Sequence, residues 1–270
     1  FVQGWRRLGK ASEQRGKLAS VREQASGIEI MKIIDDLLSV SNLETSVRDV
    51  RQGPFQTAVL TRSCGLASTP HVRTFHQDNS SVKEAGLLLT MEVLELARMA
   101  YSTSPFEAAI GMATINSLLE VDEGHCVDLN AGDLLAERGK GKKVALIGHF
   151  PFVSELRRVV EELWVIEKQP REGEFTEEKA ETIVPQADVV GITGMAFTNH
   201  TIEHLLGLCS HESYVVVLGS TTPLSPILFD YGVDAISGTK VVDPEVALCC
   251  VCQGATFRQI KGIRLLTMQR

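Results

Sequence analysis

Apolar residues in the first 120 positions recur at helical spacing, and short runs with strand character interrupt them. Residues 47–51 and 57–61 flank the turn-forming sequence Gln-Gly-Pro-Phe and predict an antiparallel hairpin. A loop is predicted over residues 63–81, followed by helices over 82–100 and 105–119. One apolar face predicts an amphipathic helix over residues 28–40, formed by Ile30, Ile33, Ile34, Leu37 and Leu38.

In the second half, apolar strand-like runs alternate with amphipathic helical segments. This alternation predicts an open, twisted parallel sheet with right-handed crossovers. The predicted strands lie near residues 142–148, 163–168, 188–193, 214–219, 234–236 and 263–268. The predicted helices lie near residues 152–162, 178–186, 199–210, 225–231 and 244–253. We therefore assign the chain to the α/β class, with a C-terminal Rossmann-like open parallel sheet and a smaller N-terminal α+β domain.

These patterns divide the chain into four segments. Residues 1–27 carry an excess of basic side chains and form an N-terminal extension, either a flexible appended tail or a helix that packs on a partner chain. Residues 28–125 are expected to form the α+β domain and residues 142–270 the Rossmann-like domain. Residues 126–141, with their Gly/Lys-rich joint, are the predicted connection.

Composition narrows the class of protein. The chain has 270 residues, of which 44% are hydrophobic and 23% charged, values typical of a soluble globular protein. A formal net charge of -7 argues against nucleic-acid binding, which needs a basic surface. No apolar run approaches the roughly 20 residues that span a bilayer, and no signal-peptide core is present. The six cysteines show no disulfide-framework spacing, so we expect a cytoplasmic, reducing location without membrane contact.

The most informative stretch is the apolar run at residues 142–148, which ends in Gly148 and continues through His149 and Phe150 into Pro151. A strand, a tight turn and a proline-started helix open a Rossmann-type half-fold. The unpaired N–H groups at such a turn are expected to hold an anionic or polar ligand. A dinucleotide fingerprint needs three glycines and only Gly148 is present, so NAD is not expected. A glycine needed only for turn geometry is the alternative.

Candidate site residues follow from the rule that ligands bind beyond the carboxyl ends of parallel strands. If the protein is an enzyme, His149 is the expected general acid or base, because imidazole titrates near neutral pH. Glu167 is expected to orient the substrate, with a solvated strand-end glutamate as the alternative. Asn116 would complete the pocket from the first domain, or else tie down the hairpin. The predicted substrate-binding residues are Asn116, Gly148, Phe150, Thr193, Gly194, Asn199, Gly219, Thr222 and Pro223.

Two further motifs contain residues that can bind metals. His200-Thr-Ile-Glu-His204 matches the His-x-x-Glu-His pattern of one metalloprotease class, but the same helix must bury apolar residues against the sheet. We expect His200 to face the crevice and His204 to face solvent. Cys249-Cys250-x-Cys252 is not a recognised zinc or iron–sulfur spacing and predicts a core helix.

Several motifs together resemble one family. They are Lys142-Lys-Val-Ala-Leu-Ile-Gly-His-Phe-Pro151, Thr193-Gly194 with Asn199-x-Thr201, Gly219-x-x-Thr-Pro-Leu-Ser-Pro226, Cys64-Gly-Leu-Ala-Ser68 and Gly111-Met-Ala-Thr-Ile-Asn116. The chain is thereby similar to the putative heavy-metal chelation family of bacteria and archaea, with only residues 1–27 outside the resemblance. The resemblance implies an enolase-N-terminal-like domain, a Rossmann-like domain and a site in the cleft between them. It further implies ligands related to metal chelators, pterins or flavins.

Three functions remain open from the sequence. The first is an enzyme or small-molecule-binding protein with an interdomain site. The second is a non-catalytic protein that binds a metal or a metal chelate through His149, His71 and His76. The third is a nucleoside or S-adenosylmethionine binder that uses Gly148 and Glu167. A divalent metal ion is the one cofactor considered, a small molecule is the expected partner, and a homo-oligomer is left open.

Overall fold

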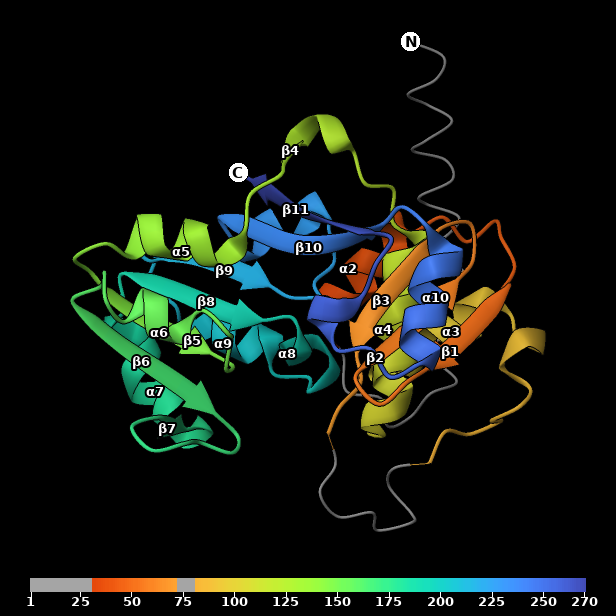
Figure 1. Cartoon of the computed structure of the whole chain (residues 1–270), viewed down its shortest axis with the longest axis horizontal. Helices are drawn as coiled ribbons and strands as arrows, with labels where there is room; N and C mark the ends of the chain where they lie inside the picture. Colours follow the sequence, from red (N-terminus) through yellow and green to blue (C-terminus); the bar gives the residue numbers. More distant parts are fainter. Residues whose placement is uncertain (1–30, 72–80) are drawn as a thin grey trace.

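A three-stranded sheet and an eight-stranded sheet lie beside each other in the computed structural model, which describes residues 31–71 and 81–270 (Figure 1). The small sheet is antiparallel and consists of β1 (Asp49–Gln52), β2 (Gln56–Leu60) and β3 (Cys64–Ser68). The predicted hairpin corresponds to β1 and β2. The prediction of a loop over residues 63–81 is wrong for its first part, because Cys64–Ser68 form the strand β3. The candidate ligand His76 and the N-terminal extension 1–27 lie outside the described residues.

Helix α4 (Pro105–Leu118) runs along β2 and β3 and matches the helix predicted over 105–119 (Figure 1). The close approach of α4 to β3 explains why β3 contains a glycine. A Cβ atom added at Gly65 would lie 2.1 Å from the Ala113 carbonyl oxygen, so this strand position requires glycine. Helix α2 (Lys32–Val40) falls within the predicted residues 28–40.

The helix predicted over residues 82–100 is wrong in its first half. Positive φ angles at Glu84 and Gly86 turn the chain there, because neither residue continues a right-handed helix in that conformation. A 3₁₀ helix η1 (Leu88–Thr90), the short α3 (Val93–Arg98) and a second 3₁₀ helix η2 (Met99–Tyr101) follow.

The large sheet has the strand order β4-β11-β10-β9-β8-β5-β6-β7. All neighbouring pairs from β10 to β7 are parallel, whereas β11 is antiparallel to both β10 and β4. The expectation of a parallel sheet throughout is therefore wrong for the last strand, which returns directly from α10 without a crossover. The strands are β4 (Cys126–Val127), β5 (Lys143–Ile147), β6 (Glu162–Glu167), β7 (Phe175–Thr176), β8 (Val189–Thr193), β9 (Tyr214–Leu218), β10 (Ala235–Val241) and β11 (Ile263–Gln269).

The six parallel strands are ordered 3-2-1-4-5-6 in chain order, which is the order of doubly wound sheets. The direction of winding reverses between β5 and β8, so the switch point lies between the loops after these two strands. The predicted α/β class is confirmed. The short β4 and β7 were not predicted, because two-residue strands carry no periodic signal.

Helices cover both faces of the large sheet. Val144 and Leu146 of β5 pack with α5 (Ala131–Gly139) and α6 (Val153–Leu156), whereas Ala145 belongs to the cluster on the other face. Burial of alternate residues on both faces explains why the strands are almost continuously apolar. The predicted helix 152–162 is wrong beyond α6, because the chain turns back and enters β6 at Glu162. The other elements are α7 (Ala180–Ile183), α8 (Met195–Thr198), α9 (Ile202–Leu208) and the 3₁₀ helices η3 (Glu123–His125), η4 (Glu177–Lys179), η5 (Val184–Gln186), η6 (Pro226–Tyr231) and η7 (Phe257–Gln259).

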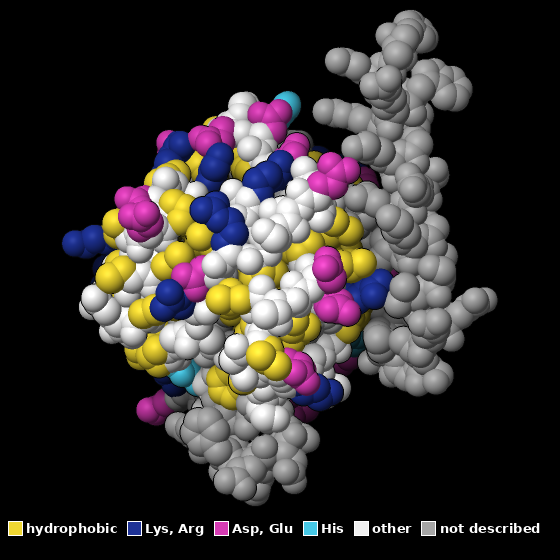
Figure 2. All heavy atoms as spheres, turned by 90° about the vertical axis from the view of Figure 1, so that its right-hand side faces the viewer, with side chains coloured by type: hydrophobic (Ala, Val, Ile, Leu, Met, Phe, Trp, Pro, Cys, Tyr) yellow, Lys and Arg dark blue, Asp and Glu magenta, His cyan; other side chains and the backbone are white. Residues whose placement is uncertain are grey.

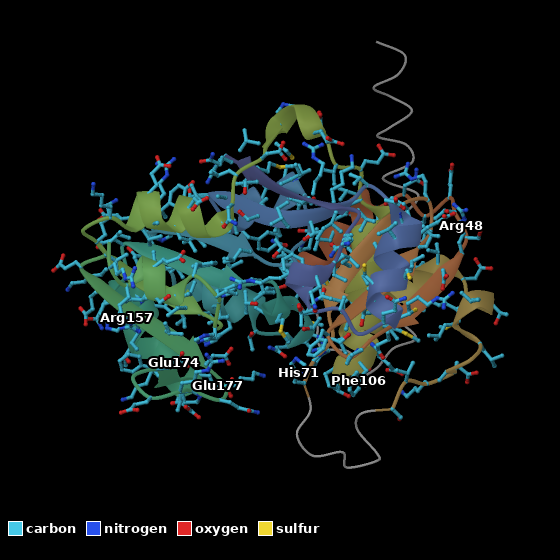
Figure 3. The ribbon with its side chains drawn as sticks, viewed as in Figure 1. Arg48, His71, Phe106, Arg157, Glu174 and Glu177 are labelled. Carbon is cyan, nitrogen blue, oxygen red and sulfur yellow. The ribbon has the colours of Figure 1, made fainter. Side chains whose placement is uncertain are left out.

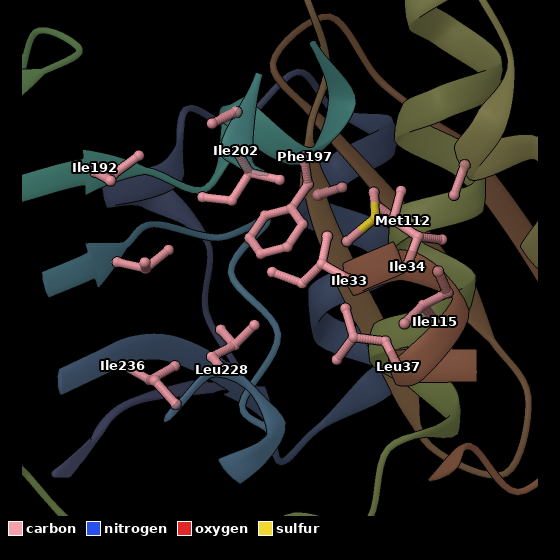
Figure 4. Packing of buried hydrophobic residues seen from close by; sticks show 14 of the residues in the cluster. Ile33, Ile34, Leu37, Met112, Ile115, Ile192, Phe197, Ile202, Leu228 and Ile236 are labelled. Atoms are coloured by element: carbon pink, nitrogen blue, oxygen red, sulfur yellow. The ribbon is translucent and has the colours of Figure 1, made fainter. Parts of the chain in front are cut away.

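The two sheets share an apolar core. One buried cluster includes Ile33 of α2 and Met112 of α4 on the small-sheet side, together with Phe197 of α8 and Ile236 of β10 on the large-sheet side (Figure 4). Helix α10 (Pro244–Cys252), which follows β10 in the chain, packs against β1 and β2 of the small sheet. The two sheets are therefore joined by buried apolar surface as well as by the chain.

The surface over the small-sheet side carries acidic and basic side chains scattered among apolar ones, without a single block of one charge (Figure 2). Within residues 31–71 and 81–270, no helix combines the length and the apolar character needed to cross a membrane.

Candidate functional site

The turn after β5 holds Gly148 at the switch point of the large sheet. Its φ of +104° lies in the left-handed region that favours glycine, and an added Cβ would make a tight contact of 3.0 Å with the Thr193 Cβ. The Gly148 N–H donates to the Ile166 carbonyl at 2.9 Å, and the His149 N–H donates to Glu167 Oε1 at 3.2 Å. The expectation of unpaired N–H groups at these two positions is therefore wrong.

Glu167 ends β6 and is committed to backbone groups. Its second oxygen, Oε2, accepts from the Lys168 N–H at 2.8 Å, while Oε1 accepts from His149. The carboxylate thus fixes the turn that carries His149, a contact that the sequence alone did not indicate.

The His149 ring lies between the carboxylate of Glu174 and the guanidinium of Arg171. Its Nδ1 is 2.6 Å from Glu174 Oε1, and its Nε2 is 2.7 Å from Arg171 Nη1. Because a guanidinium can only donate, Nε2 must accept and Nδ1 must carry the proton that it donates to Glu174. The geometry therefore holds His149 as the neutral Nδ1–H tautomer, with 27% of its side chain exposed.

Glu174 is the buried member of this group, with 6% of its side chain exposed. Burial raises the pKa of this carboxyl, but hydrogen bonds from the Arg171 N–H and from His149, together with the charge of Arg171, lower it by more. The net result is a pKa below the usual value of 4.5. Glu174 is thus an anion at neutral pH and orients the imidazole.

A cavity of about 490 Å³ opens beside His149, between α6 and the loop from β6 to β7. Three guanidinium groups line it, and among the described residues neither Arg157 nor Arg158 donates to a carboxylate. Arg157 and Glu174 lie at the outer end of the large sheet, away from His71 and Phe106 on the small-sheet side (Figure 3). The cavity is lined by His149, Phe150, Pro151, Val153, Ser154, Arg157, Arg158, Arg171, Glu172 and Glu174.

The other predicted site residues gather where the two sheets meet. Asn116 Nδ2 donates to the Leu66 carbonyl at 2.9 Å and to the Thr221 carbonyl at 3.1 Å, so it holds β3, rather than the predicted hairpin of β1 and β2, and also reaches the second half of the chain. Thr221 Oγ1 accepts from the Ser68 N–H at 2.9 Å. The loop after β9 of the large sheet is therefore hydrogen-bonded to β3 of the small sheet and to α4.

Gly194, after β8, packs closely against Thr222 in the same loop after β9. A Cβ added at Gly194 would lie 2.6 Å from both the backbone nitrogen and Oγ1 of Thr222. The buried atoms Thr222 Oγ1 and Asn116 Oδ1 have no hydrogen-bond partner among the described residues. Asn116 also lines a second cavity, of about 260 Å³, that does not include His149. Thr193 and Gly219 are at the neighbouring strand ends, Pro223 is buried after Thr222, and Asn199 ends α8.

The predicted residues thus fall into two groups rather than around one cavity: His149, Phe150 and Glu167 on one side, Asn116 and the β8 and β9 loops on the other. Sequence reasoning missed Arg157, Arg158, Arg171 and Glu174. The adjacent arginines, six and seven positions after Pro151, were the available signal.

The histidine motif begins at His200, two positions before α9, and ends at His204 within it; it is not a metal centre among the described residues. His200 Nε2 lies 2.8 Å from the Ala100 carbonyl oxygen, while His204 pairs with Glu181 at 2.8 Å on the surface. His204 therefore faces solvent, as expected. The exposed ring of His71 lies edge-on to Phe55 at 5.4 Å.

The fold and site define an α/β protein with an arginine-lined cavity at the strand ends of a doubly wound sheet. The chain belongs to the family described as putative heavy-metal chelation, whose model matches residues 130–268. A second model with the same description matches residues 34–119.

One curated protein and two solved structures are similar to this chain. The chain is 28% identical over 177 residues to an uncharacterised protein of Methanocaldococcus jannaschii, covering 62% of this chain and 68% of the relative. A crystal structure of a family protein of unknown function from Desulfitobacterium hafniense has a TM-score of 0.78 at 24% identity, covering 88% of this chain and 98% of the other. A family protein of unknown function from Pyrococcus horikoshii gives a TM-score of 0.74 at 20% identity with the same coverage. These structures establish the shared fold.

The family description directs attention to metal ligands. Among residues 31–71 and 81–270, no group of three or more His, Cys, Asp and Glu side chains is arranged to hold a metal ion. At His149 both ring nitrogens already have partners. The donor set of the described residues therefore does not fit a resident metal centre with three or more side-chain ligands.

Proposed function

We propose that this protein binds an anionic small molecule of the metal-chelating class, such as an organic polycarboxylate or its metal complex, in the cavity beside His149. The observation that carries the proposal is the set of three guanidinium groups, Arg157, Arg158 and Arg171, on one cavity of about 490 Å³. Guanidinium groups match carboxylate and phosphate oxygens in geometry and charge. In this proposal a metal enters as cargo of the ligand.

The contacts of His149 support a binding role for the imidazole. Arg171 is held by the Nε2 lone pair, a weaker partner than a carboxylate, so an incoming anion competes successfully for Arg171. Glu174 keeps the Nδ1 proton in place, and the freed Nε2 then faces the ligand as an acceptor. The ring can in this way accept a hydrogen bond from a hydroxyl or protonated carboxyl of the ligand.

Electrostatics favour the same ligand class. The chain has a formal net charge of -7, whereas the cavity is lined by three arginines, from both of its sides, against the two glutamates Glu172 and Glu174. The apolar part of the wall, Phe150, Pro151 and Val153, can cover the carbon skeleton of an organic anion.

The proposal is tested by thermal-shift measurements on the full chain with citrate, nitrilotriacetate and pyrophosphate, each alone and with Fe³⁺ or Ni²⁺, followed by calorimetric titration. We expect at least one anion to raise the melting temperature and to bind with an affinity that falls as salt increases. Absence of stabilisation by every anion, or equal stabilisation by the neutral triamide of citric acid, would overturn the proposal.

A further inference from the structure

Three of the six cysteines lie at the C-terminal end of α10, far from the cavity beside His149 in sequence and on a different sheet. Ala247, Leu248 and Val251 form the buried face of this helix against the small sheet. Cys249 and Cys252 are exposed. The expectation of a core helix therefore holds for the helix, while two of its thiols face solvent.

Helical spacing brings the two exposed thiols together. Residues three apart lie on the same face of an α-helix, with Cβ atoms about 5–6 Å apart. Cys250, which is half-buried, points about 100° away from Cys249 and packs at the edge of the buried cluster. The face thus presents a pair of thiols rather than three.

Hydrogen-bond donors approach both sulfur atoms. Gln253 Nε2 lies 3.3 Å from Cys249 Sγ, and Arg51 Nη1 lies 3.6 Å from Cys252 Sγ. Asp49 fixes Arg51 through bonds of 2.6 and 2.9 Å, so the guanidinium is held beside the thiol by the small sheet. Both sulfur atoms therefore accept hydrogen bonds while they stay exposed, and sulfur is the ligand atom that soft metal ions prefer.

Two other thiols differ in their surroundings. Burial, and to a smaller extent Asp49, raises the pKa of Cys64 to about 12. Burial, followed by Asp234, raises the pKa of Cys209 to about 11. Both thiols are therefore protonated at neutral pH and poor ligands. Burial also raises the pKa of Cys126, which is half-buried. Among the described residues, Cys249 and Cys252 are thus the exposed thiols, and a hydrogen-bond donor approaches each of them.

We infer that Cys249 and Cys252 together form a site for one soft metal ion that accepts two sulfur ligands, such as Ag⁺, Cu⁺ or Hg²⁺. Thiolates select such ions over hard cations. On binding, two S–H bonds break, two metal–sulfur bonds form and two protons pass to solvent, with no change in oxidation state. This inference is independent of the proposed function, because it involves neither the cavity nor its arginines.

The test uses the full chain, reduced and without an affinity tag. Ag⁺ titration is followed by calorimetry, and phenylarsine oxide provides a second probe, since its As=O group reacts with two thiols to give two As–S bonds and water. We expect one tight Ag⁺ site and one arsenical adduct by intact mass spectrometry. Cys249→Ser or Cys252→Ser should remove the adduct and weaken Ag⁺ binding roughly 100-fold, because a second linked ligand adds about 10²–10⁴-fold.

Cys250→Ser is the matched control. It should retain Ag⁺ binding and the arsenical adduct, since the Cys250 thiol lies on another side of the helix. Cys249 and Cys252 are exposed, so their serine variants should unfold with a free energy within about 0.5 kcal/mol of the wild type. Undiminished Ag⁺ binding in Cys249→Ser or Cys252→Ser, or an equal loss in Cys250→Ser, would overturn the inference.

Discussion

Phe197 tests whether the two sheets share one core. Its side chain is 0% exposed and is among the largest fully buried groups in the described chain. Figure 4 shows the ring between Ile202 on the large-sheet side and Ile33 of α2. Phe197→Ala removes the ring from a site closed on both sides, and such a truncation costs about 3–5 kcal/mol. Because both sheets contribute to the cluster, the loss should destabilise the whole described structure.

The assay is urea unfolding at 25 °C, followed by circular dichroism and by tryptophan fluorescence. With a denaturant dependence of about 3 kcal/mol per molar urea, the midpoint should fall by about 1–1.7 M in one transition. Phe197→Leu should shift it in the same direction by less, and provides a measurable variant if Phe197→Ala does not fold. Val159→Ala, at a side chain 41% exposed, is the control and should change stability by less than about 0.5 kcal/mol. A loss below about 1 kcal/mol, or two transitions of which only one moves, would refute the shared core.

Two further predictions concern polar groups. Thr222→Val should leave the free energy of unfolding unchanged or raise it by about 1 kcal/mol, because the buried Oγ1 has no partner within the described chain; a loss above about 1 kcal/mol in denaturant unfolding would contradict this. The lowered pKa of Glu174 predicts stability that is present above pH 4.5 and is lost as the pH falls through the lower folded value. Glu174→Gln should remove that part of the acid sensitivity between pH 6 and 3, and identical pH profiles for the two proteins would contradict the assignment.

The large sheet was predictable because its strands are buried on both faces. Val144 to Ile147 form a short, unbroken apolar run that ends in Gly148, and such a run bounded by a turn residue is typical of a fully buried strand. The third strand of the small sheet was missed because Cys64, Gly65 and Ala67 are small residues with weak strand preference. Their burial depends on α4, which lies about 50 positions later in the chain.

The candidate site was only partly predictable, because some of its residues are brought together by segments that lie far apart in the chain. His149 follows the diagnostic glycine, so local sequence identified it. Its partners Arg171 and Glu174 lie beyond β6, in a segment without periodicity, and only the pairing of β6 with β5 brings them to the imidazole. Asn116 was expected either to cross the junction or to tie down the hairpin; its amide crosses to Thr221 and otherwise bonds to β3, not to the hairpin of β1 and β2.

The central claim is that the arginines beside His149 bind an anionic chelator. The most direct test is the calorimetric affinity for the tightest-binding anion among citrate, nitrilotriacetate and pyrophosphate, compared between wild type and Arg157→Gln/Arg158→Gln. Arg258→Gln, a charge change at an exposed arginine outside the cavity lining, is the control. We predict a loss of at least roughly tenfold in the double variant, since hydrogen bonds to charged groups contribute about 1.5–3 kcal/mol. We predict no change in the control. An unaltered affinity in the double variant would contradict the account.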